Sequence, residues 1–251
     1  MADIFLMVLV IVIGSVISLA GGSLIFLSKK RRTDAILYAL PFGAGALLAA
    51  AFFDLLPESF ELAEPRGLLV WTLVGFTAFF LLERLASWFH HHHEHLAVHQ
   101  HRHETQNTMV MIGDMLHNII DGVAIGAAFL ANPVSGVITT LAVSAHEIPK
   151  EIGTFGMLLS RGWNEKKVLL MNIATAVATL ATALAIYGLG NTIALPEAKL
   201  LALTSGMFIY IAASDIIPDI HEQPRGVGSI QAGVLVSGIV FVGAVIYILG
   251  V

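Results

Sequence analysis

Apolar runs of about 20 residues recur along this chain from one end to the other, and no other feature limits its fold so strongly. A helix that crosses a membrane needs about 20 mostly apolar residues. Charged residues make up only 12% of the sequence, against about 25% in soluble domains. The sequence therefore predicts an all-α polytopic membrane protein, surrounded by the lipid bilayer and without a separate soluble domain.

We expect eight transmembrane helices that form one domain over residues 1–251. The first run directly follows Met-Ala-Asp, lacks a basic segment and is too long for a signal-peptide core, so we interpret it as a retained helix. The predicted spans are 4–28, 35–60, 67–89, 108–131, 134–160, 168–190, 199–221 and 228–250.

Two features of composition exclude classes of function. The chain contains no cysteine, which removes disulfide frameworks, thiolate metal sites and cysteine nucleophiles. Its net charge of −5 offers no basic surface for a nucleic acid, so we expect no nucleic-acid partner.

The basic residues predict the orientation in the membrane. Arg66 and Lys199 lie on one side of the membrane, and Lys150 lies inside a span. The others share the opposite side, which the positive-inside rule makes cytosolic. We therefore expect a cytoplasmic (inner) membrane protein with both termini on the non-cytosolic side. The residues on the cytosolic side are Lys29, Lys30, Arg31, Arg32, Arg84, Arg102, Arg161, Lys166, Lys167 and Arg225.

Two acidic segments near helix ends repeat each other. Residues 54–61 and 215–222 share the order Asp, two aliphatic residues, Pro, an acid, two residues and Glu. The spans that carry them run in opposite directions, which is the trace of an inverted repeat. Coincidence is the alternative for so short a pattern. If the repeat holds, spans one to three mirror spans six to eight around the central pair, four and five.

The central pair carries polar residues in the middle of the membrane. Residues 114–122 read Asp-Met-Leu-His-Asn-Ile-Ile-Asp-Gly, and residues 146–153 read His-Glu-Ile-Pro-Lys-Glu-Ile-Gly. A charge at the bilayer centre costs about 2.5–3.5 kcal/mol on insertion scales. Several such residues in adjacent helices need mutual pairing, a bound ion, or both.

Residues four positions apart lie on the same face of a helix, so these polar residues form three i, i+4 stripes. Imidazole and carboxylate without sulfur suit borderline divalent ions such as zinc, iron, manganese or cobalt. The alternative is a buried ion-pair cluster that only holds helices together. Pro149 cannot donate to the helix ladder and is expected to loosen its span. The stripes are His117 with Asp121, His146 with Lys150, and Glu147 with Glu151.

Further acids mark a possible transport path on both sides of this centre. Those of the two proline motifs have a second interpretation, as solvated helix ends or structural pairs. The path residues are Asp54, Glu58, Asp114, Glu151, Asp215 and Asp219.

A histidine-rich connection is predicted over residues 90–106, on the cytosolic side. Clustered neutral imidazoles bind transition metals, so metal buffering or sensing is one interpretation. A solvated loop without such a role is the other. Its histidines are His90, His91, His92, His93, His95, His99, His101 and His103.

The segments His-Asn-Ile-Ile-Asp-Gly at 117–122 and His-Glu-Ile-Pro-Lys-Glu at 146–151 resemble helices four and five of the ZIP family, the zinc- and iron-regulated transporter-like proteins, in its bacterial type. The resemblance implies uptake of divalent metal into the cytosol, zinc first and also iron, manganese or cadmium. It further implies a homodimer, an elevator-like movement, and no cofactor besides the transported ion. The implied metal ligands are His117, Asn118, Asp121, His146 and Glu147.

Lys150 departs from the family pattern, which often has His or Glu at this position as a ligand to a second ion. An ammonium group cannot bind a cation. We therefore expect a mononuclear site in which Lys150 takes the place of the second metal and pairs with Glu147 or Asn118. Span six also lacks a carboxylate, since Asn172 and Thr175 are its main polar residues.

Two other functions compete with metal transport. His146-Glu147 begins like the His-Glu-x-x-His pattern of zinc peptidases, but Lys150 stands where the second histidine belongs. An intramembrane metallohydrolase would need ligands from the neighbouring helix. A proton-driven carrier of another small solute is the second alternative, since carboxylates and histidines relay protons. The sequence favours a transporter that is not an enzyme.

Overall fold

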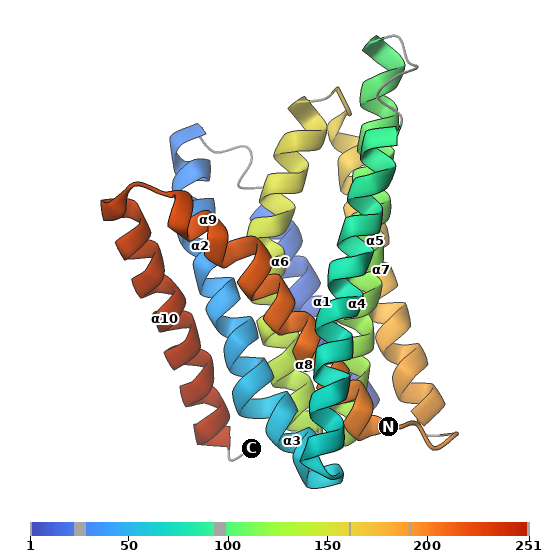
Figure 1. Cartoon of the computed structure of the whole chain (residues 1–251). Coiled ribbons are helices and arrows are strands. Elements are labelled where there is room, and N and C mark those ends of the chain that lie inside the picture. Colours follow the sequence, from blue (N-terminus) through green and yellow to red (C-terminus); the bar gives the residue numbers. More distant parts are fainter. Residues whose placement is uncertain (1, 23–28, 93–98, 161, 191, 250–251) are drawn as a thin grey trace.

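The structure, a computed structural model, describes residues 2–22, 29–92, 99–160, 162–190 and 192–249. Within these ranges the long elements are all helices and no strand occurs, which confirms the all-α prediction. Figure 1 shows the long helices side by side, with the beginning of α1 and the end of α10 at the same end of the bundle. The helices are α1 (Ala2–Gly22), α2 (Lys29–Ala50), η2 (Ala51–Leu55), α3 (Leu56–Leu62), α4 (Pro65–His92), α5 (His99–Ala131), α6 (Pro133–Ser160), α7 (Glu165–Gly190), α8 (Glu197–Tyr210), η3 (Ile211–Ile216), α9 (Ile217–Glu222) and α10 (Arg225–Leu249).

Six helical segments in the described ranges are long and apolar enough to cross a membrane. Two further runs of similar length complete the bundle: α6, which carries the polar residues 146–151, and α8 with η3 and α9, which is divided into three segments. The predicted number of eight spans stays a prediction. The six segments are Asp3–Ala20, Leu37–Leu62, Pro65–Leu85, Val110–Ala131, Glu165–Gly190 and Arg225–Leu249.

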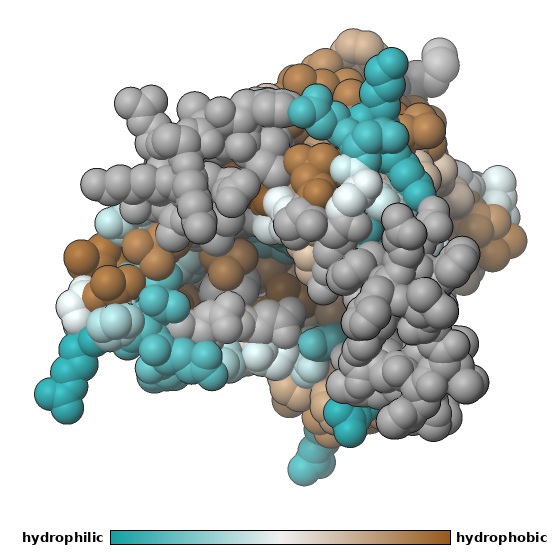
Figure 2. All heavy atoms as spheres, turned by 90° about the horizontal axis from the view of Figure 1, so that it is seen from above, coloured by the Kyte–Doolittle hydropathy of each residue, from teal (hydrophilic) through white to brown (hydrophobic). Residues whose placement is uncertain are grey.

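The surface fits a surrounding bilayer. Many large apolar side chains of α1, α4, α7 and α10 are exposed, among them Phe5, Leu73, Leu170 and Phe241. Seen from the end where α4 finishes and α5 begins, hydrophilic residues lie on the end face and hydrophobic ones at its margin (Figure 2). An exposed apolar surface of this extent is what a membrane-embedded bundle presents to lipid.

The two copies of the repeated motif adopt the same local structure. Each contains a π-helical turn, η2 or η3, that leads into a short α-helix, α3 or α9. Pro57 and Pro218 stand at the second residue of these short helices. A proline has no N–H to donate, so one backbone hydrogen bond of the helix is missing at each proline. The wider π-helical turn before it accommodates this missing bond.

The repeat extends to the contacts between helices. Gly45 of α2 and Gly206 of α8 each stand nine residues before the aspartate of their motif. A Cβ on Gly45 would overlap a backbone oxygen of α10, and one on Gly206 a backbone oxygen of α4. Gly238 of α10 and Gly75 of α4 make the reciprocal close approaches. The pairs α2 with α10 and α8 with α4 thus correspond, as an inverted repeat requires.

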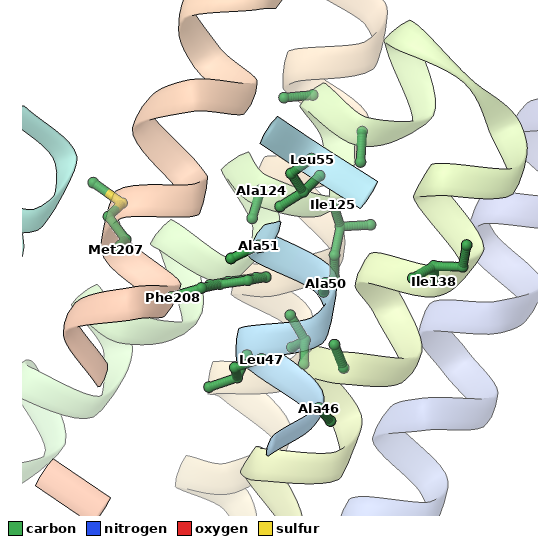
Figure 3. Close-up of a cluster of buried hydrophobic side chains, with 14 of the residues drawn as sticks. Ala46, Leu47, Ala50, Ala51, Leu55, Ala124, Ile125, Ile138, Met207 and Phe208 are labelled. Carbon is green, nitrogen blue, oxygen red and sulfur yellow. The ribbon is translucent and has the colours of Figure 1, made fainter. Parts of the chain in front are cut away.

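The helices form two groups that meet across a core of small and apolar side chains. One group contains α1, α5, α6 and α7, and the other contains the pairs α2 with α10 and α4 with α8. Between the groups α2 packs against α6, and α8 against α5. Figure 3 shows Leu47, Ala50 and Ala51 of this core on successive turns of one helical segment, with Phe208 and Ile125 near it. The alanines let α2 approach its neighbours closely, next to the polar residues of α5 and α6.

Candidate metal centre

Four side chains of α5 and α6 meet at one point. His117 and Asp121 lie one helical turn apart on α5, and His146 and Glu147 are consecutive on α6. Each offers a ligand atom, and these atoms all lie within 4.8 Å of one another. Asp121, His146 and Glu147 are almost fully buried, whereas His117 is partly buried. The structure thus brings together four of the five residues that the sequence suggests as ligands.

The distances within this cluster suit a tetrahedral ion. The two Nε2 atoms of His117 and His146 lie 3.1 Å apart. His117 Nε2 lies 3.6 Å from Asp121 Oδ2 and 3.5 Å from Glu147 Oε1. From His146 Nε2 the same two oxygens lie at 3.8 Å and 3.4 Å. Tetrahedral zinc with ligands at 2.0–2.1 Å places neighbouring ligand atoms about 3.3 Å apart.

Neighbouring groups of the protein hold the two histidine rings in place. His146 Nδ1 lies 3.4 Å from the carbonyl oxygen of Ala142, an acceptor, so Nδ1 carries the hydrogen and Nε2 is left free to bind a metal. The ring of Phe79 packs edge-on against His117, with centroids 5.4 Å apart. Both carboxylate oxygens of Asp121 are buried without a hydrogen bond to the described part of the chain. A buried carboxylate in this state is stabilised by a cation.

Lys150 lies directly beside the cluster. Its Nζ atom is 2.5 Å from Glu147 Oε1 and 2.9 Å from Asp114 Oδ1. The sequence suggested Glu147 or Asn118 as its partner, and the structure selects Glu147 together with Asp114. Glu147 Oε1 therefore faces both the ammonium group and the two histidines.

Asn118 is the fifth suggested ligand, and its amide makes hydrogen bonds to other groups. Its Nδ2 atom donates to the carbonyl oxygen of Asp114 at 3.0 Å. Its Oδ1 atom accepts a hydrogen bond from Thr179 Oγ1 at 2.9 Å. Both ends of the amide are thus engaged, and Asn118 connects α5 to α7.

Of the remaining path acids, Asp54, Glu58 and Glu151 are not among the four residues of the cluster. Asp54 is buried in η2 and accepts a hydrogen bond from Ser135 Oγ at 2.7 Å. Glu58 is partly exposed on α3, and Glu151 is buried on α6. Asp215 and Asp219 belong to η3 and α9, but their side chains are not among those that the structure describes.

The histidine-rich connection is more helical than the sequence suggests. His90, His91 and His92 end α4, while His99, His101 and His103 belong to the first turns of α5. The side chains of these six are not described, and His93 and His95 lie outside the described residues.

One structural residue of the site was missed by sequence reasoning. A Cβ on Gly43 of α2 would lie 2.8 Å from His146 Cα and 2.9 Å from the oxygen of Ala145. Pro149 offers no N–H to that oxygen, yet α6 continues as an α-helix and is not loosened there. Only a residue without a side chain lets α2 pack so closely against the backbone at His146.

The carboxylate of Glu83, which accepts a hydrogen bond from Tyr210 at 2.7 Å, was also missed.

A helical membrane protein with a buried histidine and carboxylate cluster between two of its helices is of the kind that handles divalent metal ions in the bilayer. The family model for the ZIP zinc transporter matches residues 4–108 and 90–249. The chain therefore belongs to the ZIP family.

Single relatives match about half of the chain. Zinc transporter ZIP4 of Mus musculus is 43% identical over 113 residues, 44% of this chain and 16% of that protein. Zinc transporter ZIP10 of Danio rerio is 39% identical over 111 residues, 44% of this chain and 13% of that protein. Zinc transporter foi of Drosophila melanogaster is 36% identical over 132 residues, 51% of this chain and 18% of that protein. The matched stretch is thus less than a fifth of the length of each relative.

Proposed function

We propose that this protein carries divalent metal ions, zinc first, across the membrane into the cytosol through a single-ion site between α5 and α6. The observation that carries the proposal is the spacing of His117, Asp121, His146 and Glu147, whose ligand atoms lie 3.1–3.8 Å apart in the five measured pairs. Family membership and the zinc transporters among its relatives support zinc as the substrate. Iron, manganese and cadmium suit the same ligands.

The site holds one ion because Lys150 takes the place of a second. Its ammonium group contacts Asp114 and the same oxygen of Glu147 that faces the two histidines. A second divalent ion there would meet a positive charge about 4 Å or less away, which is strongly repulsive in a medium of low dielectric constant. Lys150 supplies the charge compensation without a second metal.

Transport requires the site to face each side of the membrane in turn. The group α1, α5, α6 and α7 carries all four ligands, and it meets the other group across the small residues of α2. Such a surface allows one group to slide against the other, in an elevator-type movement. The other group would then form the interface of the homodimer that the family resemblance implies.

The two ends of the path differ in chemistry. Asp54 and Glu58 attract ions at the non-cytosolic side, where both termini lie. Asp114 and Glu151, and then Asp215 and Asp219, follow toward the cytosol. The histidine-rich connection lies at that cytosolic exit, where its imidazoles buffer the arriving ion. In this proposal the protein resides in the cytoplasmic membrane, and the positive-inside rule gives its orientation there.

The geometry favours transport over the alternative functions. In a hydrolase Glu147 would have to act as a base, but Lys150 already holds its carboxylate. A small organic solute would need a larger binding space, whereas four ligand atoms within 4.8 Å of one another fit around one ion only.

The test is zinc influx into proteoliposomes, followed with an enclosed metal-sensitive dye. His117→Ala and Asp121→Ala should each abolish the flux, whereas His221→Ala, at an exposed position of α9, should retain it. Hydrolysis of added peptides without any flux would replace transport by enzymatic activity. Equal flux in all variants would show that zinc does not pass through this site.

A further inference from the structure

A second group of buried polar atoms lies one turn beyond the metal centre on α6. Glu151 is 7% exposed, and Ser18 of α1 and Asn172 of α7 lie beside its carboxylate. Ser18 is 3% and Asn172 is 6% exposed. Glu151 Oε2, Ser18 Oγ and Asn172 Oδ1 each lack a hydrogen bond to the described part of the chain. Ser18 and Asn172 are close enough to hydrogen-bond Glu151, yet one oxygen of each of the three residues has no hydrogen bond of good geometry to any described residue.

A narrow cavity reaches this group from the side of the metal centre. It has a volume of about 30 Å³, and its wall includes Ser15, Ser18, Glu147 and Glu151. A cavity needs about 10–15 Å³ to hold one water molecule. The space therefore accepts a small ion or a water molecule next to Ser18 and Glu151, while Asn172 approaches Glu151 from outside this wall.

The charges of the centre leave one carboxylate uncompensated. Lys150 lies between Glu147 and Asp114, and a bound divalent ion would share Asp121 and Glu147. Four carboxylates then face three positive charges. Glu151 is the one left over, since no ion pair joins it to a basic side chain in the described ranges. A single positive charge beside Glu151 would balance the set.

We propose that Glu151, Ser18 and Asn172 bind a monovalent metal cation, for which Na⁺ is the probe. A proton would satisfy one of the three oxygens, whereas a cation contacts all of them at once. Hard alkali ions prefer oxygen ligands, and the group offers no imidazole. One carboxylate supplies one negative charge, so the site discriminates against the divalent ion that the neighbouring cluster binds.

Thermal unfolding of the purified full chain in nanodiscs, with divalent metal removed by a chelator, tests this site. Tm is compared in NaCl and in choline chloride at equal ionic strength and pH. A ligand that binds only the folded state stabilises it in proportion to the logarithm of its concentration. We expect Na⁺ to raise Tm by several degrees in the original chain, in His117→Ala and in Ser237→Ala, an exposed position of α10. Glu151→Gln should lose this rise.

Ser18→Ala is a milder variant. The Na⁺ concentration that produces half of the maximal rise in Tm should be several-fold higher in this variant than in the original chain. Broadening of the ²³Na NMR line by the protein, lost in Glu151→Gln, measures binding without unfolding. Equal Tm in both salts, or an unchanged Na⁺ effect in Glu151→Gln, would overturn the proposal. A response to pH alone would also overturn it, because the site would then hold a proton. The assay contains no divalent metal, so its result does not depend on zinc transport.

Discussion

The ammonium nitrogen of Lys150 lies 2.5 Å from Oε1 of Glu147, and the same oxygen lies 3.4 Å from Nε2 of His146. One carboxylate oxygen thus faces a permanent cation on one side and the two imidazoles of the metal centre on the other. The lysine reduces the negative charge around Glu147 and Asp114, and in our proposal it takes the place of a second ion. This pairing shows how a basic residue is accommodated beside the candidate metal centre of a ZIP family chain.

Lys150→Glu should create a second metal site. The new carboxylate would face Asp114 and Glu147, and three carboxylates without a cation attract a divalent ion. We expect purified Lys150→Glu to retain one additional zinc ion per chain by elemental analysis. Lys166→Glu, at an exposed position at the start of α7, makes the same charge change and should leave the zinc content unaltered. Unchanged zinc content in Lys150→Glu would contradict this role of the lysine.

Asn118 and Asp121 should differ sharply in their effect on zinc affinity. Asp121→Ala removes a ligand and should raise the Kd by about 100-fold, which corresponds to about 2.7 kcal/mol. Asn118→Ala removes only hydrogen bonds to Thr179 and to its own helix. It should lower the free energy of unfolding by about 1 kcal/mol and change the Kd by less than about threefold. Calorimetric titration of both variants decides this point, and equal losses would make Asn118 a ligand.

Gly43→Ala should weaken zinc binding although it removes no ligand. The added methyl group would lie 2.8 Å from His146 Cα, so α2 or the backbone of α6 must shift. A shift of this kind displaces His146 from its partners, and we expect the Kd to rise by about tenfold, or 1.4 kcal/mol. Gly233→Ala on α10, whose Cβ would meet nothing within 4 Å, is the matched control. If both variants bind zinc like the original chain, the close approach of α2 has no bearing on the site.

The corresponding glycines of the repeat should have corresponding effects on stability. In Gly45→Ala and in Gly206→Ala the new Cβ would overlap the backbone of the partner helix. Overpacking of this type costs about 1–3 kcal/mol, so both variants should unfold at clearly lower temperature. Gly233→Ala again serves as the control, with little change in Tm. A loss of stability in only one of the two would show that the two helix pairs are not equivalent.

The sequence predicts which side chains lie close together where the geometry of one helix decides it. The i, i+4 spacing places His117 above Asp121 on α5, and adjacency in the chain brings Glu147 next to His146. It also identifies the repeated Asp-x-x-Pro motif, whose two copies have the same π turn. These features depend on the periodicity of one helix, which can be read directly from the order of the residues.

Contacts between helices were harder to predict, because periodicity does not say which helix a given face meets. Neither Ser135 as the partner of Asp54 nor Gly43 behind His146 could be derived from spacing. For Lys150 the sequence left Glu147 and Asn118 open, and Asp114 was assigned to the path alone. The antiparallel packing of α5 against α6 places Asp114 within reach of Lys150 and turns Asn118 toward α7.

X-ray absorption at the zinc edge, on the purified chain loaded with zinc in nanodiscs, tests the central claim most directly. One ion held by His117, Asp121, His146 and Glu147 predicts two imidazole nitrogens and two carboxylate oxygens at about 2.0–2.2 Å. It also predicts no scattering from a neighbouring zinc ion. A spectrum without imidazole scattering, or one with a zinc–zinc distance, would contradict the single-ion site.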